Sequence, residues 1–242
     1  MKIALLIAGE IRNDKIYFNE LIKKYDIDVF LSSNNKFGVR HTNYKDIPLE
    51  KRFLSKGNNI NINEFNINNL KKYNLEEMGL YNNYFNINQS IIKLCGEKHS
   101  VIGTIYNIYH INKCLEMMLE YEKVNEKYDI IIKIRPDLYI NDIEFEQAIN
   151  LIKIKKNKLI FSKNGSNKFK KSDKFFLGSR SLIIDFIEKI NIYINKIWKN
   201  YYKQNTPHNL IPIGERLFNL VITEYKLDNL ILNDKNTKII RK

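Results

Sequence analysis

The chain begins with an alternation of apolar and polar blocks that predicts a strand, a helix and a second strand. Residues 3–8 form a continuous apolar run, which is typical of a strand covered on both faces. Residues 18–25 carry apolar side chains at helical spacing, and Asn13 and Asp14 are suitable caps before them. The segment 26–33 is predicted as the second strand. Together these elements make a βαβ unit, so the two strands should be parallel.

Residues 34–89 break this pattern. The stretch KGNNININEFNINNLKKYN is of low complexity, and its Asn and Ile residues alternate. Alternation of this kind can imitate a strand, but Asn is a poor strand residue. We therefore interpret residues 34–89 as an irregular, Asn-rich insertion that could contain short helices.

Regular spacing returns near residue 100. A stripe of apolar positions predicts a long helix over 101–122, which leads into a strand at 129–134. The remaining predicted elements are a short helix (145–152), two strands (158–162 and 173–179) joined by a Lys-, Asn- and Gly-rich loop, a helix (182–201), a last helix (212–225) and a closing strand (229–233). Because strands and helices alternate, the sequence predicts an α/β fold with a mostly parallel, Rossmann-like sheet flanked by helices. One domain over residues 1–242 is the simplest organisation for this length.

The charge of the chain points to anionic partners. The formal net charge is +13, and basic proteins bind nucleic acid, acidic lipid or phosphorylated small molecules. The same excess of lysine would also arise from an AT-rich genome, which favours Asn, Lys and Ile codons. Composition alone leaves both explanations open.

Two further counts bear on the compartment. Cys95 and Cys114 are too few for a disulfide framework or a cysteine zinc site, which suggests a reducing environment. The apolar run 3–8 is short for a signal peptide and is followed by acidic Glu10. No apolar segment approaches the roughly 20 residues that a membrane span needs. We expect a cytoplasmic protein, with contact to a membrane surface left open.

Three polar clusters follow predicted parallel strands. They are Gly9–Arg12, Ser32–Asn34 and Arg135–Asp137. In an open α/β sheet, ligands bind outside the carboxyl ends of the strands, so these clusters should line one crevice. The competing interpretation is ordinary loop chemistry, since every strand must end in something polar.

The cluster Arg135-Pro136-Asp137 carries the most specific chemistry. Proline removes a backbone donor and ends the strand, which would hold the Asp137 carboxylate just past the sheet. A single carboxylate next to diphosphate oxygens can bind a divalent cation that keeps several waters. Arg135 could instead neutralise phosphate directly through its planar guanidinium group. An Arg–Asp pair that merely closes the strand is the alternative.

Two more acids are candidates, and several site types are excluded. Asp173 precedes an aromatic strand, and Glu215 lies in the first turn of a predicted helix, where the helix dipole would stabilise it in any case. The sequence has no GxGxxG or GxxxxGK[ST] loop, no GxSxG elbow, and no histidine spacing typical of a metal site. His208 could meet a substrate, whereas His110 lies on the long helix and is expected to be a packed or surface side chain.

Taken in order, the motifs resemble those of a known family. ALLIAGEIR resembles the opening strand ALxISGxxR of small glycosyltransferases, and YDIIIKIRPDL resembles their strand end YDxVIRxRPDL. SDKFFLGSRSLI is similar to DKFxIGSxxxM, and IGERLFNLVI is similar to a late hPExLL helix. Proteins of this kind occur in bacterial surface-polysaccharide clusters and among large DNA viruses. The chain thus resembles nucleotide-sugar glycosyltransferases of the GT-A fold, although residues 34–89 have no counterpart.

The resemblance implies a nucleoside diphosphate sugar as donor and a hydroxyl group of a glycan, a lipid-linked molecule or a protein as acceptor. GT-A enzymes usually carry an Asp-x-Asp motif that binds Mn²⁺ or Mg²⁺ and the donor diphosphate. Here Arg135 stands at the place of the first acid and Asp137 at the second. Either Asp137 holds a metal with help from water and diphosphate, or Arg135 replaces part of the metal's charge.

By the same resemblance, the other candidates take roles around the donor. The expected nucleotide and diphosphate contacts are Gly9, Arg12, Ser32, Ser33 and Arg135. Asp173 is the candidate contact to the donor sugar or the acceptor, and Glu215 is the candidate base. The sequence leaves open whether the anomeric configuration is inverted or retained.

Three alternatives remain at this point. A nucleic-acid-binding module would explain the charge, but the basic residues are spread along the chain and no nucleic-acid motif occurs. An inactive protein of the same fold could act as a partner subunit. Aromatic residues near a helix end, Trp198, Tyr201 and Tyr202, could also dock the protein on anionic lipid.

Overall fold

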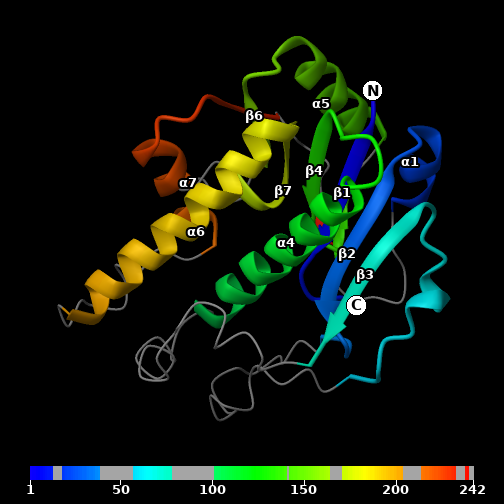
Figure 1. Cartoon of the computed structure of the whole chain (residues 1–242), viewed down its shortest axis with the longest axis horizontal. Coiled ribbons are helices and arrows are strands. Elements are labelled where there is room, and N and C mark those ends of the chain that lie inside the picture. Colours follow the sequence, from blue (N-terminus) through cyan, green and yellow to red (C-terminus); the bar gives the residue numbers. More distant parts are fainter. Residues whose placement is uncertain are drawn as a thin grey trace.

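A single sheet forms the centre of the molecule. The computed structural model describes residues 1–12, 18–38, 57–77, 101–140, 142–163, 171–203, 214–232 and 238–239. Seven strands make up the sheet, in the spatial order β3 (Leu70–Glu76), β2 (Asp28–Asn34), β1 (Ile3–Ala8), β4 (Ile130–Ile134), β7 (Lys171–Ser179), β6 (Leu159–Lys163) and β8 (Asn229–Ile231) (Figure 1). Neighbours are parallel, except that β7 is antiparallel to both β4 and β6. The predicted fold class, α/β with a mostly parallel sheet, is confirmed.

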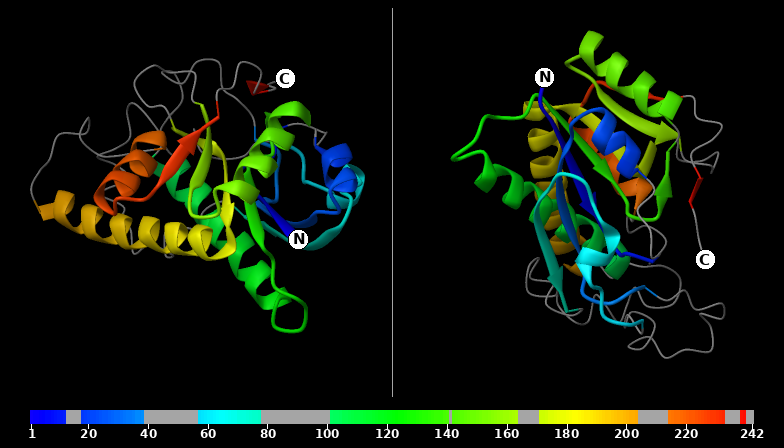
Figure 2. Two further views of the ribbon diagram at one scale, coloured as in Figure 1. Left: turned by 90° about the horizontal axis from the view of Figure 1, so that it is seen from above. Right: turned by 90° about the vertical axis from the view of Figure 1, so that its right-hand side faces the viewer.

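Helices cover both faces of the sheet (Figure 2). Helices α4 (Val101–Tyr121), α6 (Arg180–Lys203) and α7 (Glu215–Glu224) pack on one face, and α1 (Asn19–Lys24) and α5 (Asp142–Ile154) pack on the other. Away from the main sheet, the structure contains a 3₁₀-helix, η2 (Ile62–Phe65), and a small ladder of β5 (Leu138–Tyr139) with β9 (Lys238–Ile239). Among the helices described here, none has the length and apolar composition of a membrane span.

Strand β1 lies near the middle of the sheet and serves both cores. Ala4, Leu6 and Ala8 face the core under α4, α6 and α7, while the alternate residues Ile3, Leu5 and Ile7 face the core under α1 and α5. Side chains of a strand point alternately to the two faces, so a strand buried on both faces must be apolar throughout. The prediction of a strand at residues 3–8 and of its parallel pairing with the second strand is confirmed.

The predicted elements of the second half are also present. Helix α4, strand β4 and helix α5 lie within a few residues of their expected bounds. The same holds for β6, β7, α6, α7 and β8. Cys114 lies on the buried face of α4, and its thiol donates to the backbone oxygens of Ile7 and Phe30, while Cys95 lies outside the described residues.

The Asn-rich segment differs from its prediction in one respect. Leu70–Glu76 was expected to be irregular, but it forms β3, an edge strand that pairs in parallel with β2. An edge strand needs partners on one side only, so a half-exposed and polar sequence is sufficient there. The short helix expected in this region is present as η2, while residues 39–56 and 78–89 lie outside the described part of the chain.

Asparagines around β3 serve turns and caps. The side chain of Asn61 accepts a hydrogen bond from the backbone N–H of Asn63 and so caps η2. Asn66 and Asn69 adopt φ values of 46° and 51°. Asn enters this left-handed region more readily than most residues do. The low-complexity composition is therefore compatible with ordered structure at these positions.

An ion pair joins the end of α4 to the start of α6. The Arg180 guanidinium donates to both carboxylate oxygens of Glu122 at 2.7–3.0 Å, and the backbone N–H of Tyr128 donates to the same carboxylate. Burial by itself would raise the pKa of Glu122. The hydrogen bonds from Arg180 and Tyr128, together with the positive charge of Arg180, nevertheless hold this pKa below its ordinary value of 4.5.

We predict that Glu122→Gln lowers the free energy of unfolding by about 2–3 kcal/mol at pH 7, since it leaves the Arg180 guanidinium partly buried without its counter-ion. A carboxyl group with a depressed folded-state pKa stabilises the protein above its ordinary pKa, and this contribution is lost as pH falls through the lower value. The difference in unfolding free energy between the two proteins should therefore begin to shrink below pH 4.5 and disappear once the pH falls below the depressed pKa. Glu126→Gln, which removes an exposed partner of Lys2, is the matched control. An equal loss at pH 7 and pH 3.5 would contradict the assignment.

Candidate active site

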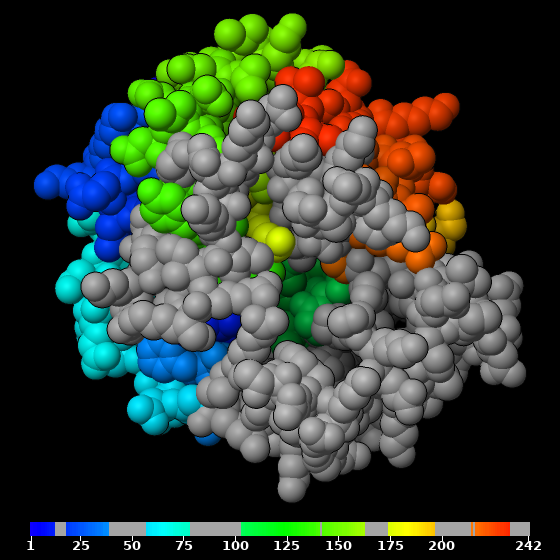
Figure 3. Space-filling view, turned by 180° about the vertical axis from the view of Figure 1, so that it is seen from behind, coloured from blue at the N-terminus to red at the C-terminus, as the bar shows by residue number. Residues whose placement is uncertain are grey.

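The order of the strands creates a place for a ligand between β1 and β4. From β1 the chain continues to β2 and β3 on one side, whereas β4 lies on the other side of β1. Loops that leave adjacent parallel strands in opposite directions open a crevice at their carboxyl ends. In Figure 3, atoms from the first residues, from the start of α4 and from β7 are visible near one another on this face.

Two of the three predicted clusters meet at this switch point. Strand β4 ends in a turn in which the Arg135 N–H donates to the Lys174 oxygen of β7 and the Leu138 N–H donates back to the Arg135 oxygen. After β1, Gly9 has a φ of 123°, which a residue with a Cβ rarely adopts. A Cβ atom there would lie about 3.8 Å from the Pro136 ring and 4.0 Å from Arg135 Cγ. The backbone of Gly9 thus lies directly against the end of β4.

Four charged side chains, Glu10, Arg12, Arg135 and Asp137, form what we call the strand-end cluster. Arg135 donates through Nε to Asp137 Oδ1 (2.9 Å) and through Nη2 to Oδ2 (2.6 Å), a two-pronged contact. Arg12 Nη1 lies 3.5 Å from Asp137 Oδ2. Arg12 also donates through Nε to Glu10 Oε2 (2.8 Å), and its Nη2 lies 2.7 Å from the same oxygen. The Asp137 side chain is 1% exposed, whereas those of Arg135 and Arg12 are 21% and 33% exposed. Two guanidinium groups therefore reach the surface around one buried carboxylate.

Ser32 and Ser33 lie at the same edge but point into the protein. The Ser33 hydroxyl accepts a hydrogen bond from the Ile11 N–H, which fixes the loop after β1. The Ser32 hydroxyl lies 2.8 Å from His110 Nδ1. Both serines are fully buried, so in this structure they support the crevice from behind and do not join the strand-end cluster.

His110 connects the long helix to the end of β2. Its Nε2 lies 3.4 Å from Asn34 Oδ1 and its Nδ1 faces the Ser32 hydroxyl, which also accepts from Asn74 of β3. One arrangement satisfies these groups: Nε2–H donates to Asn34, and Nδ1 accepts from Ser32. Burial lowers the pKa of His110 to about 3, so the ring is neutral at pH 7. The sequence indicated a packed or surface side chain, and the structure shows a packed one with polar partners.

A buried lysine is the residue that the sequence analysis missed. Lys133 of β4 is fully buried and its amino group lies 5.8 Å from the centre of the Phe176 ring. It lies two residues before Arg135 and two residues after Ile131. Alternate residues of a strand point to the same face, so Lys133, like Ile131, lies on the sheet face covered by α4, α6 and α7. The sequence feature that could have identified it is the single lysine within the apolar run IIIKI at residues 130–134. Lysine is rarely buried completely, so this letter marks the strand as unusual.

The two remaining acids are placed by their backbones alone. Asp173 lies in β7, next to the Lys174 oxygen that binds Arg135, and Glu215 is the first residue of α7. The N–H of Gly214 donates to the Thr104 hydroxyl, so α7 begins beside the first turn of α4. The side chains of Asp173, Glu215, Trp198, Tyr201 and Tyr202 lie outside the described part of the structure, as does His208.

The donor set at Asp137 does not suit a divalent cation. Within the described ranges, no three His, Cys, Asp or Glu side chains converge as a metal site would require. Both Asp137 oxygens already accept from Arg135. A cation bound to either oxygen would lie about 4 Å from that guanidinium group, where repulsion between charges of +2 and +1 amounts to about 8 kcal/mol at an effective dielectric constant near 20. The arginines occupy the place that a metal would need.

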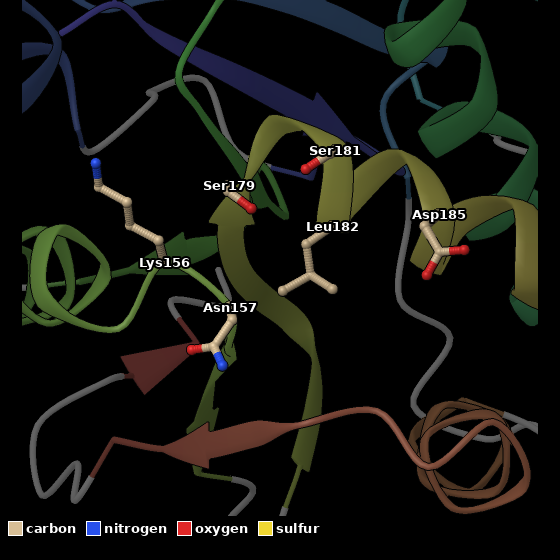
Figure 4. A pocket seen from close by; sticks show the side chains of 6 residues that line it. All are labelled: Lys156, Asn157, Ser179, Ser181, Leu182 and Asp185. Atoms are coloured by element: carbon tan, nitrogen blue, oxygen red, sulfur yellow. The ribbon is translucent and has the colours of Figure 1, made fainter.

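A cavity of about 590 Å³ lies elsewhere. It is lined by Lys156, Asn157, Ser179, Ser181, Leu182 and Asp185 (Figure 4). Ser179 pairs with Ile130, the first residue of β4, so this cavity is at the amino end of that strand, opposite the strand-end cluster. Figure 4 shows the Lys156 amino group directed away from the other lining side chains. Its polar groups do not converge on a common point, and we assign it no role in the chemistry.

Comparisons with known proteins add little to these observations. No protein-family model matches the chain, and no curated protein matches it in sequence. One similar solved structure is described as a glycosyltransferase involved in the glycosylation of the major capsid of PBCV-1. It has 12% sequence identity and a TM-score of 0.36, over 96% of this chain and 82% of that one. At this level of similarity, the function has to be argued from the site.

We predict that His110 makes the stability of the protein depend on pH. A base whose folded-state pKa is depressed is neutral in the folded protein but takes up a proton in the unfolded one, so stability falls as pH drops from about 6.5 towards 3. The slope attributable to His110 approaches about 1.4 kcal/mol per pH unit. Urea unfolding between pH 7 and pH 4 should show this slope reduced in His110→Gln and retained in Ser32→Ala. An unchanged slope in His110→Gln would contradict the prediction.

Proposed function

We propose that the protein is a glycosyltransferase that moves a sugar from a nucleoside diphosphate sugar to a hydroxyl acceptor. The observation that carries this proposal is the pair of partly exposed guanidinium groups, Arg12 and Arg135, at the switch point of a mostly parallel sheet. Guanidinium groups bind phosphate through paired hydrogen bonds. A crevice at such a switch point is the usual ligand site of an open α/β sheet. Two of the four sequence motifs that resemble glycosyltransferases contain these arginines: ALLIAGEIR contains Arg12, and YDIIIKIRPDL contains Arg135.

In this proposal the donor diphosphate lies against the strand-end cluster. Negative charge builds up on the diphosphate as the bond to the sugar breaks, and Arg135 and Arg12 stabilise it. Preorganised charges of this kind usually contribute the largest share of catalysis. Gly9 allows the backbone to come close to the ligand, while Ser32 and Ser33 hold the ends of β2 and β1 in place. The roles predicted for the two serines thus become supporting ones.

The acceptor hydroxyl must lose a proton to a base. Two acids, Asp173 and Glu215, are our candidates for the residues around the acceptor. Topology places Asp173 beside the end of β4 and Glu215 at the start of α7. We retain Glu215 as the candidate base and Asp173 as the candidate contact to the donor sugar or acceptor. The acceptor is a hydroxyl group of a glycan, a lipid-linked molecule or a protein, in polysaccharide or glycan synthesis. Peripheral contact with an anionic membrane would suit a lipid-linked acceptor.

We expect Arg135→Ala to reduce turnover about 10²–10³-fold, the effect of removing one group that stabilises developing charge. Asp137→Ala should cause a comparable loss, because Arg135 and Arg12 would lose the counter-ion that orients them. The donor is first identified by thermal shift with a panel of nucleotide sugars, since a ligand at 100 times its Kd adds about 2.7 kcal/mol to stability. Turnover is then measured as release of the nucleoside diphosphate. Circular dichroism verifies that each variant is folded, and Glu126→Gln serves as the control. Near-normal turnover in both alanine variants would refute the assignment.

Glu215 is tested through the pH dependence of the reaction. A base that takes the acceptor proton is lost in Glu215→Gln, so turnover should fall by about 10²-fold or more and lose its dependence on the ionisation of this acid. Transfer to the acceptor should fall more than hydrolysis of the donor by water. Full activity of Glu215→Gln across pH 5–9 would place the base elsewhere or indicate a retaining mechanism. If nucleotide-sugar binding disappears at moderate salt, the result would favour the nucleic-acid-binding alternative instead, because nucleic-acid affinity depends steeply on salt.

A further inference from the structure

We propose that the strand-end cluster binds a diphosphate group without a divalent cation, with Asp137 serving as an internal counter-ion that positions Arg135 and Arg12. This inference rests on the proposed function and specifies how its donor is held. It assigns Asp137 a positioning role, in place of the metal-binding role that its sequence position suggests.

The first step concerns the access to Asp137. Its side chain is 1% exposed, and both carboxylate oxygens accept hydrogen bonds from Arg135. Arg12 approaches the same Oδ2 atom at 3.5 Å. A carboxylate so enclosed by two cations has its charge satisfied within the protein. Its function is then to hold the guanidinium groups, as a buried counter-ion does.

The second step concerns the fixed orientation of Arg135. Its backbone N–H is bound to the Lys174 oxygen, its backbone is followed by the rigid Pro136, and its side chain is held in the plane of the Asp137 carboxylate. Asp137 takes two of the five N–H groups that a guanidinium carries, along one edge. A side chain fixed in this way loses little freedom when an anion binds, which favours affinity.

The third step concerns Glu10, the acid of the cluster that an incoming diphosphate would displace from Arg12. It binds Arg12 from the loop after β1, and both side chains are partly exposed. Gly38 leaves space for it, because a Cβ atom at that position would overlap the Glu10 side chain. The two acids and two arginines cancel in formal charge, so an incoming diphosphate must compete with an acid. Glu10 is that acid, since Asp137 is buried and Glu10 is not.

The test measures binding of UDP, GDP, ADP, CDP and dTDP by isothermal titration calorimetry, once with EDTA and once with Mn²⁺. We expect at least one nucleoside diphosphate to bind in EDTA, with a Kd that Mn²⁺ changes by less than about 5-fold. Binding only with Mn²⁺, or a Kd improved about 5-fold or more by it, would overturn the inference and leave the proposed glycosyltransferase function intact. Failure of all five nucleotides and of their sugar conjugates to bind under both conditions would overturn both.

Three variants separate the roles of the cluster in the EDTA experiment. Arg135→Lys keeps the charge but loses the paired hydrogen bonds, and should weaken binding about 10-fold or more. Glu10→Gln removes the competing acid and should strengthen binding about 3- to 10-fold. Asp137→Asn keeps an oxygen that can accept from Arg135, so cation-free binding should persist with a loss of no more than about 5-fold.

A metal-ligand role for Asp137 predicts the opposite result. Asp137→Asn would then abolish a Mn²⁺-dependent affinity, and Arg135→Lys would have little effect. Glu126→Gln, which removes an equal charge at an exposed site, controls for general electrostatics in the Glu10→Gln comparison. Weaker binding in Glu10→Gln than in the unmodified protein would contradict the exchange of Glu10 for phosphate.

Discussion

The complete burial of β1 is the constraint on which the rest of the structure depends. All six of its residues are buried, and its backbone pairs with β2 on one side and β4 on the other. A strand with no exposed face or edge has to be covered by helices on both faces. It also has to be followed by a loop that leaves the sheet at its carboxyl end. That loop, Gly9–Arg12, and the turn that follows β4 are brought together because their strands are neighbours.

Two buried carboxylates lie where elements meet, and each is paired with arginine. Asp137 is enclosed by arginines at the carboxyl ends of β1 and β4, and Glu122 is enclosed by Arg180 and the Tyr128 N–H at the opposite edge. His110 remains neutral between Ser32 and Asn34. A buried charge without a partner costs several kcal/mol, so these contacts constrain how the helices can sit on the sheet. At the proposed ligand site, the guanidinium groups of Arg12 and Arg135 also reach the surface.

The antiparallel strand β7 links the two halves of the site. It runs beside β4 with its amino end at the carboxyl end of β4, and its Lys174 oxygen fixes the backbone of Arg135. Reversing one strand brings the start of β7, including Asp173, to the edge where the parallel strands end. The proposed contacts to diphosphate and to sugar are therefore supplied by β4 and β7, which are neighbours in the sheet. The distance between the two contacts thus depends on the register in which these strands pair.

The sequence by itself determined the elements with strong periodicity. The run at residues 3–8, the stripe of α4 and the proline after β4 each follow from local physics, namely burial on two faces, helical spacing and a missing backbone donor. Periodicity could not reveal β3, because an edge strand accepts a polar sequence, nor the reversal of β7, because strand direction depends on pairing. It also could not show that Ser32 and Ser33 turn inwards or that Arg135, Arg12 and Asp137 meet. Those contacts join residues far apart in the chain, and only the tertiary structure, through the neighbouring positions of β1 and β4, decides them.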